Sequence, residues 1–146
     1  MRAFLGALAG IVAGVAALLA IGFVGGTLFP IPVDPHIQGT VEQAVAALPN
    51  APLASLLFIT LSWFLGGLVS ALVAKLIARR PAAAWSAAGV ITLLTFANVF
   101  LAPFPAWMAI ASVAAPLIGG LIGNHLVAGA APEAATPEAG DAPAEV

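Results

Sequence analysis

Few residues of this chain carry groups that do chemistry, and one pair of them has metal-ligand character. Asp34 and His36 stand two residues apart in the segment FPIPVDPH, and Glu42 follows a short distance further on. A metal centre normally needs three or four converging ligands. We therefore keep Asp34 and His36 as polar candidates and expect no metal ion.

A second set of polar side chains lies inside long apolar stretches. Thr92, Thr95 and Asn98 fall on one broad face if this stretch is helical, and Ser112 lies in the next stretch. One interpretation is a polar path lined by these groups. The other is hydrogen bonding between helices, which contributes about 0.6 kcal/mol on average in membranes. We favour hydrogen bonding between helices and keep the polar path open.

His125 is a further titratable candidate, near the end of the last apolar stretch. An imidazole there could sense pH or bind a ligand, although a lone histidine at such a position usually does neither. The chain has no cysteine, and no nucleophile, base and orienting acid form a pattern that predicts catalysis. We therefore expect no enzymatic activity, no cofactor and no nucleic-acid partner.

Composition indicates which solvent surrounds these residues. Of 146 residues, 62% are hydrophobic and 7% charged, with a mean hydropathy of +1.14, whereas soluble domains have about 25% charged residues. Four apolar stretches each reach the roughly 20 residues that cross a hydrocarbon core about 30 Å thick. The sequence therefore predicts an all-α membrane protein with four transmembrane helices, at residues 4–28, 53–78, 82–102 and 105–128.

The basic residues predict how these helices are oriented. Arg2 precedes the first helix, Lys75, Arg79 and Arg80 surround the joint between the second and third, and the other two loops hold no Lys or Arg. The positive-inside rule then places both termini in the cytoplasm. We expect the Lys75 ammonium to snorkel to the headgroups. The first stretch is longer than the 7–15 apolar residues of a signal peptide, so we expect a retained anchor.

Two segments lie outside the predicted spans. Thr40 followed three residues later by Gln43 is typical of a capping box, which predicts a short helix at 41–48. This helix lies either flat at the outer membrane interface or packed on the bundle, and both interpretations stay open. Residues 130–146 contain Pro, Ala and acidic residues without aromatics, which predicts a disordered acidic cytoplasmic tail.

The two halves of the chain resemble each other. GVAALLAIGFVGGTLFP, from Gly14, and GVITLLTFANVFLAPFP, from Gly89, match at seven positions without a gap, and each second helix has a double glycine 14 residues after a proline. The pattern predicts a duplicated helical hairpin with both copies in parallel orientation. Chance similarity between apolar segments is the alternative.

Small residues recur four apart in three of the predicted helices. Such patterns allow helix backbones to approach closely in membranes, so we predict that they pack the bundle. Channels and dimers also use glycine faces, which is the functional alternative. The predicted helix-packing residues are Gly6, Gly10, Gly14, Gly66, Ser70, Gly119 and Gly123.

Several motifs together point to a family. They are FPIPVDP after the first helix, ALPNAP before the second, WFLGGLVSALVA within it and FANVFLAPFPAWM leading into the fourth. With these motifs the chain resembles a set of small uncharacterised four-helix membrane proteins of bacteria. The resemblance spans most of the chain except the tail, and it implies four helices in a bacterial inner membrane. It implies no activity, cofactor or functional residue.

Two functional hypotheses follow. The leading one is a structural or accessory membrane protein that acts through helix contacts in the bilayer, as a homo-oligomer or as a small subunit of a complex. The alternative is a small channel or transporter for a neutral or small solute, with a path between copies. Because the predicted spans hold no ionisable residue at their centres, the sequence argues against ion coupling.

Overall fold

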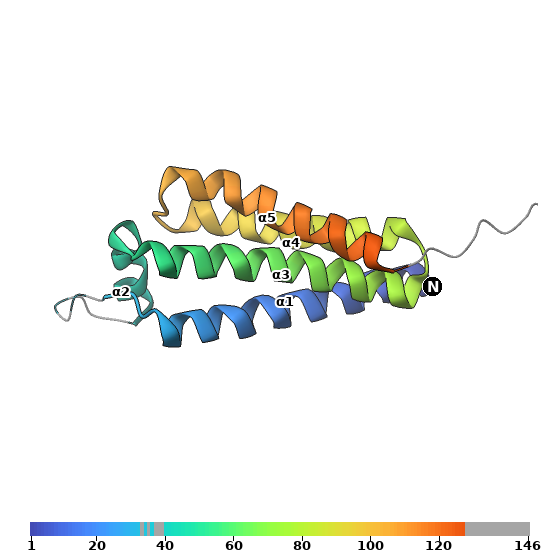
Figure 1. The fold of residues 1–146 in the computed structure, drawn as a ribbon, viewed down its shortest axis with the longest axis horizontal. Coiled ribbons are helices and arrows are strands. Elements are labelled where there is room, and N and C mark those ends of the chain that lie inside the picture. Colours follow the sequence, from blue (N-terminus) through green and yellow to red (C-terminus); the bar gives the residue numbers. More distant parts are fainter. Residues whose placement is uncertain (33, 35, 37–39, 128–146) are drawn as a thin grey trace, which may run out of the picture.

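A computed structural model of the chain describes residues 1–32, 34, 36 and 40–127. The predicted tail at 130–146 lies outside the described residues. Four long helices run side by side, and a short helix lies across one end of the bundle (Figure 1). The helices are α1 (Arg2–Leu28), α2 (Thr40–Ala47), α3 (Leu53–Ala78), α4 (Pro81–Leu101) and α5 (Ala106–Leu126), with a 3-10 turn at Leu48–Asn50 after α2.

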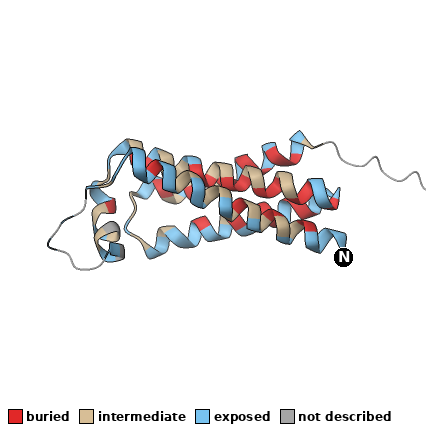
Figure 2. Ribbon diagram, turned by 90° about the horizontal axis from the view of Figure 1, so that it is seen from below, coloured by how far each residue is buried: buried red, intermediate tan, exposed pale blue. Residues whose placement is uncertain are grey.

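The long helices have the length and the surface of membrane-spanning segments. The shortest, α4 and α5, have 21 residues each, or about 32 Å at about 1.5 Å per residue. The outer faces of the four long helices carry exposed large apolar side chains such as Phe23, Leu93 and Ile110. Buried residues line their inner faces (Figure 2). The described chain is thus a multi-pass membrane protein with four transmembrane helices, which confirms the predicted fold class.

Prolines set several helix ends, and they explain small departures from the predicted bounds. α4 begins on Pro81 rather than at residue 82, because the first helical position needs no N–H donor. It ends at Leu101 because Ala102 precedes a proline and is extended, at φ −136° and ψ 144°. Pro105 lies before α5 rather than inside it.

α3 has the predicted bounds, 53–78, and α1 ends at the predicted residue 28, whereas some other bounds differ slightly from prediction. α1 begins two residues earlier than the predicted residue 4, and α5 ends at Leu126 rather than 128. The short helix predicted at 41–48 spans Thr40–Ala47, because the 3-10 turn takes up Leu48 and the following Pro49.

Helix α3 is the centre of the bundle. It packs against α1, α4 and α5, whereas α1 contacts α3 and α4. α2 crosses one end of the bundle, which we call the α2 end (Figure 1). Met1 and the α3–α4 joint lie at the opposite end, which we call the N-terminal end.

The predicted duplication stays a prediction, and the pairing of the helices can be compared with it. α1 with α3 and α4 with α5 form two helical hairpins, and one glycine of each double glycine, Gly67 of α3 and Gly119 of α5, lies at the contact between these two helices. The packing departs from an exact two-fold relation. Such a relation would match the α3–α4 contact with one between α1 and α5, and the described residues make no such contact.

All the buried residues of α1 are glycines. These are Gly6, Gly10, Gly14 and Gly25. A β-carbon on Gly10 would lie 2.5 Å from the carbonyl oxygen of Ser70, and one on Gly14 would lie 2.6 Å from the Ser70 β-carbon. The α1 and α3 backbones are therefore in direct contact along the face that carries the predicted helix-packing residues.

The opposite side of α3 meets α5 equally closely. A β-carbon on Gly119 would lie 2.1 Å from the carbonyl oxygen of Phe64, and one on Gly123 would lie 2.3 Å from that of Leu68. On α3, a β-carbon on Gly67 would lie 2.2 Å from the Pro116 carbonyl oxygen. Any larger side chain at these positions must separate the two helices.

This geometry predicts that Gly119→Ala destabilises the bundle, since the added methyl meets main-chain atoms of α3 that cannot move independently. We expect a loss of about 1–3 kcal/mol in the free energy of unfolding, measured by denaturant titration in mild detergent. The matched control is Gly89→Ala, because a β-carbon there meets nothing within 4 Å. Equal stability of the two variants would contradict the close approach of α3 and α5.

Candidate functional site

Two of the three polar candidates of α4, Thr95 and Asn98, line a groove in the side of the bundle. The groove has a volume of about 420 Å³ and opens between α1 and α4, with α3 behind them. Trp63 of α3 lines it and is 2% exposed, so its ring closes the inner side. The lining residues are Val15, Leu18, Trp63, Leu94, Thr95, Ala97, Asn98 and Leu101.

The three polar residues of the predicted α4 face have different surroundings. Thr95 is buried, Thr92 is half-buried and Asn98 is exposed. The Thr92 hydroxyl donates to the Ala88 carbonyl oxygen of its own helix at 2.9 Å. The Asn98 carboxamide makes no hydrogen bond to any residue that the structure describes. The broad polar face predicted from sequence is therefore one inward hydroxyl and one outward carboxamide.

Thr95 makes a hydrogen bond that a proline in the neighbouring helix requires. Pro116 lies inside α5 and has no N–H, so the carbonyl of Ser112, four residues earlier, lacks its helical donor. The Thr95 hydroxyl approaches the Ser112 carbonyl oxygen at 2.6 Å. It also lies 3.1 Å from the Ile91 carbonyl and 3.0 Å from the Thr92 carbonyl, which have amide donors of their own helix. The Thr95 hydroxyl therefore donates its hydrogen to the carbonyl oxygen of Ser112.

Most other hydroxyls in the spans donate to a carbonyl of their own helix. Thr60 donates to Leu56 at 3.0 Å, and Ser62 donates to Ile59 at 2.7 Å. Ser112 donates its own hydroxyl to Ala109 at 2.8 Å. Ser70, a predicted packing residue, is fully buried against α1, and its hydroxyl oxygen has no partner within the described chain. These groups do not form a continuous polar path.

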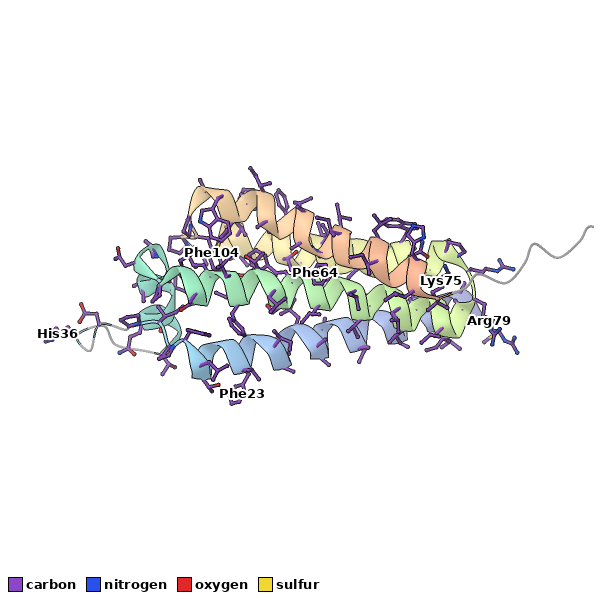
Figure 3. The ribbon with its side chains drawn as sticks, in the orientation of Figure 1. Phe23, His36, Phe64, Lys75, Arg79 and Phe104 are labelled. Carbon is purple, nitrogen blue, oxygen red and sulfur yellow. The ribbon has the colours of Figure 1, made fainter. Side chains whose placement is uncertain are left out.

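At the N-terminal end, Lys75 lies inside the bundle. Its side chain is 6% exposed, and its ammonium donates to the main-chain carbonyl of Asn124 in the last turn of α5. The expectation that Lys75 snorkels to the headgroups is therefore wrong. A carbonyl at a helix end has no amide donor of its own, and the negative end of the helix dipole attracts a cation. Lys75 accordingly caps the end of α5. Figure 3 labels Lys75 at the same end of the bundle as Arg79.

Asn124, which accepts the Lys75 hydrogen bond through its main chain, has an amide side chain, and the next residue, His125, has an imidazole. Asn124 is 9% exposed, and its side-chain oxygen is one of two buried polar atoms without a hydrogen-bond partner in the described residues. His125 points outward and is exposed. The structure therefore does not combine His125 with the other polar candidates.

Asp34 and His36 form a local turn at the opposite end of the molecule. The Asp34 carboxylate accepts a hydrogen bond from the His36 main-chain N–H at 2.8 Å, and His36 lies at the tip of this end in Figure 3. Among the residues that the structure describes, no three His, Asp or Glu side chains come close enough to hold a metal ion.

Comparison with known proteins adds no assignment. No protein-family model, curated protein or solved structure matches this chain.

Sequence reasoning overlooked three residues that shape this region. Pro116 could have been found, because a proline inside a predicted membrane helix leaves a carbonyl that needs another donor. Trp63 packs in a buried cluster with Leu56 and Met108. It also closes the groove and contacts Phe104 edge to face at 6.0 Å between ring centroids. Nothing in the sequence indicated that the Lys75 side chain points into the bundle.

The Thr95–Ser112 bond predicts a coupled effect of two substitutions. Thr95→Val should lower the free energy of unfolding by about 1–2 kcal/mol, since it leaves the Ser112 carbonyl unpaired. In a Pro116→Ala background the loss should be smaller, because the new alanine would supply the missing N–H to that carbonyl. The double-mutant cycle, measured by denaturant titration in detergent, isolates this coupling.

The control for this cycle is Thr92→Val, whose hydroxyl donates within α4. We expect it to be nearly neutral in both backgrounds. Equal losses from Thr95→Val with and without Pro116 would show that the bond does not replace the amide donor.

Proposed function

We propose that this chain is a non-catalytic membrane subunit that acts through contacts between transmembrane helices. The observation that carries the proposal is the contrast between the interior and one outer face. Inside, hydroxyls such as Thr95 and Ser112 bond to main-chain carbonyls, and glycine contacts bring α3 against α1 and α5. Outside, Asn98 and the groove beside it remain unmatched by any described residue.

The cost of an unpaired carboxamide supports a contact role for this face. A polar group in hydrocarbon without a partner costs several kcal/mol. Asn98 lies between Leu94 and Leu101, which are 50% and 82% exposed, so apolar side chains surround it on the helix surface. A helix of another membrane protein chain that covered the groove would supply the missing partner. Small and polar residues are the usual means of association between helices in membranes.

The proposal includes a location and an orientation. Arg2, Arg79 and Arg80 are exposed at the N-terminal end, and Asp34 and Glu42 lie at the α2 end. By the positive-inside rule, the N-terminal end faces the cytoplasm. The family resemblance of the sequence supports the inner membrane of a bacterium as the site.

Reporter fusions test this orientation. A reporter that is active only outside the cytoplasm should be inactive when fused after Val127 and active when inserted beside Asp34. A reporter that is active only inside should show the opposite pattern. Activity of the external reporter at the C-terminal position would overturn the orientation without affecting the helix-contact role.

The helix-contact role predicts the behaviour of purified protein in liposomes. We expect vesicles with the full chain to release neither ions nor small neutral solutes faster than protein-free vesicles, because the described spans enclose no continuous polar path. Extraction in mild detergent with determination of native mass should give a complex larger than one chain.

One outcome would favour passage of a solute instead. It is a flux that Asn98→Leu abolishes and Asn124→Leu preserves, since the first change removes the outward carboxamide and the second removes an amide near the N-terminal end. That result would make the groove part of a path between copies and would overturn the helix-contact role.

A further inference from the structure

We propose that the three exposed arginines of the N-terminal end, Arg2, Arg79 and Arg80, form a binding site for the phosphate of an anionic lipid headgroup. This inference goes beyond the helix-contact role and does not depend on it. It follows from the unpaired charge of the three guanidinium groups, from their position at the ends of the spans, and from the backbone conformation of Arg79.

Unpaired charge is the first observation. The chain has four Lys and Arg residues, and the Lys75 ammonium is hydrogen-bonded to the end of α5. The three arginine side chains are exposed and make no ion pair or hydrogen bond with any residue that the structure describes. The acidic residues of the described chain, Asp34 and Glu42, lie at the opposite end. The described part of the N-terminal end thus carries positive charge without a counter-charge.

Close packing of α1 and α3 brings the three arginines together. A β-carbon on Gly6 would lie 2.8 Å from the Ala78 β-carbon, so the start of α1 lies against the end of α3. Arg2 is one turn before Gly6, and Arg79 directly follows Ala78. The joint between α3 and α4 consists of Arg79 and Arg80. All three arginines therefore lie beside one contact between helix ends.

The depth of this contact in the bilayer identifies the partner. Arg2 is the first residue of α1, and Arg79 and Arg80 separate two membrane spans. Residues directly at the end of a hydrophobic span lie at the level of the headgroups, where lipid phosphates are abundant. A guanidinium group binds a phosphate through two parallel N–H···O bonds. A headgroup with net negative charge fits best, because the ammonium group of a zwitterionic headgroup already neutralises its phosphate.

The backbone of Arg79 is a separate indication that its charge is used. Arg79 is the one non-glycine residue of the described chain with a positive φ, at φ 53° and ψ 24°. Glycine usually occupies this left-handed position after a helix, because a β-carbon is sterically unfavourable there. A position that favours glycine thus holds a charged side chain. Contact of that side chain with a headgroup phosphate gives a reason for the arginine.

The short joint between α3 and α4 fixes the backbone of its two arginines. Arg80 is extended, at φ −129° and ψ 131°, and Pro81 begins α4 directly after it. Proline fixes its own φ and restricts the preceding residue to extended conformations. Because the backbone is set before a lipid binds, less conformational freedom is lost on binding.

Lipid titration of the full-length chain in mild detergent tests the site, with bound lipids counted by native mass spectrometry. Anionic phosphatidylglycerol should bind with a dissociation constant about tenfold below that of zwitterionic phosphatidylcholine. Arg79→Gln and Arg80→Gln should each raise the phosphatidylglycerol constant about fivefold and leave the phosphatidylcholine constant unchanged. The matched control is Asn50→Asp, which changes the net charge equally at an exposed residue of the α2 end. It should alter neither constant.

Arg79→Gly separates the role of the charge from the role of the residue in the fold. Glycine adopts the left-handed conformation without steric cost, so this variant should resist unfolding in lipid-free detergent at least as well as the native chain. It should nevertheless bind phosphatidylglycerol about fivefold more weakly. A purely structural role of Arg79 predicts the opposite, which is a loss of stability with unchanged lipid binding.

Two further measurements distinguish the lipid from other sources of negative charge. The other four carboxylates of the chain belong to residues outside the described part, and a full-length variant neutralises them as Glu133→Gln, Glu138→Gln, Asp141→Asn and Glu145→Gln. This variant should keep the native preference for phosphatidylglycerol. A preference that appears only in this variant would assign the arginines to the chain's own carboxylates. Inorganic phosphate at the lipid concentration should not displace phosphatidylglycerol, and equal binding of both would assign the site to free phosphate.

Three more results would overturn the lipid site. They are equal dissociation constants of the two lipids for the native chain, equal effects of Arg79→Gln and Asn50→Asp, and an Arg79→Gly variant that loses stability but not lipid binding. None of these results concerns contact between chains. The helix-contact role is tested separately, by the solute flux and the native mass described above.

Discussion

The close approach of α3 to its neighbours is the constraint on which the rest of the bundle depends. Lipid surrounds the helices on the outside, so burial of apolar side chains gives little drive for association, and direct van der Waals contact must supply it. α3 provides two small-residue faces, with Gly66 and Ser70 toward α1 and Gly67 toward α5. Because α3 makes close contacts with both α1 and α5, the positions of these two helices are fixed relative to α3.

Side-chain size explains why the bundle is tight at one end and open at the other. Near the N-terminal end the contacts are between alanines, among them Ala74, Ala78 and Ala87. Near the α2 end, Trp63 and Met108 form a cluster of large side chains. Helices that meet through alanine lie closer than helices that meet through tryptophan. The groove beside Asn98 is therefore a consequence of this change in side-chain size along the bundle axis.

Sequence reasoning recovered the helices and part of the site. The number and approximate bounds of the spans follow from apolar length and from prolines such as Pro81, which are local signals. The direction of each polar side chain is a different matter, because it depends on how far each helix is rotated about its axis. Thr95 and Asn98 share a broad face in the sequence, yet one points to Ser112 and the other outward. The groove involves α1, α3 and α4 together, so no local pattern predicts it.

Pro116 has a consequence for biogenesis. The carbonyl it leaves without an amide partner is satisfied by Thr95, which belongs to the preceding helix. During synthesis α4 leaves the ribosome before α5, so the hydroxyl donor is already in place when the proline-containing segment enters the bilayer. The order of the two helices along the chain is thus also the order in which their hydrogen bonding can be completed. The reverse order would expose an unpaired carbonyl to lipid until the next helix arrived.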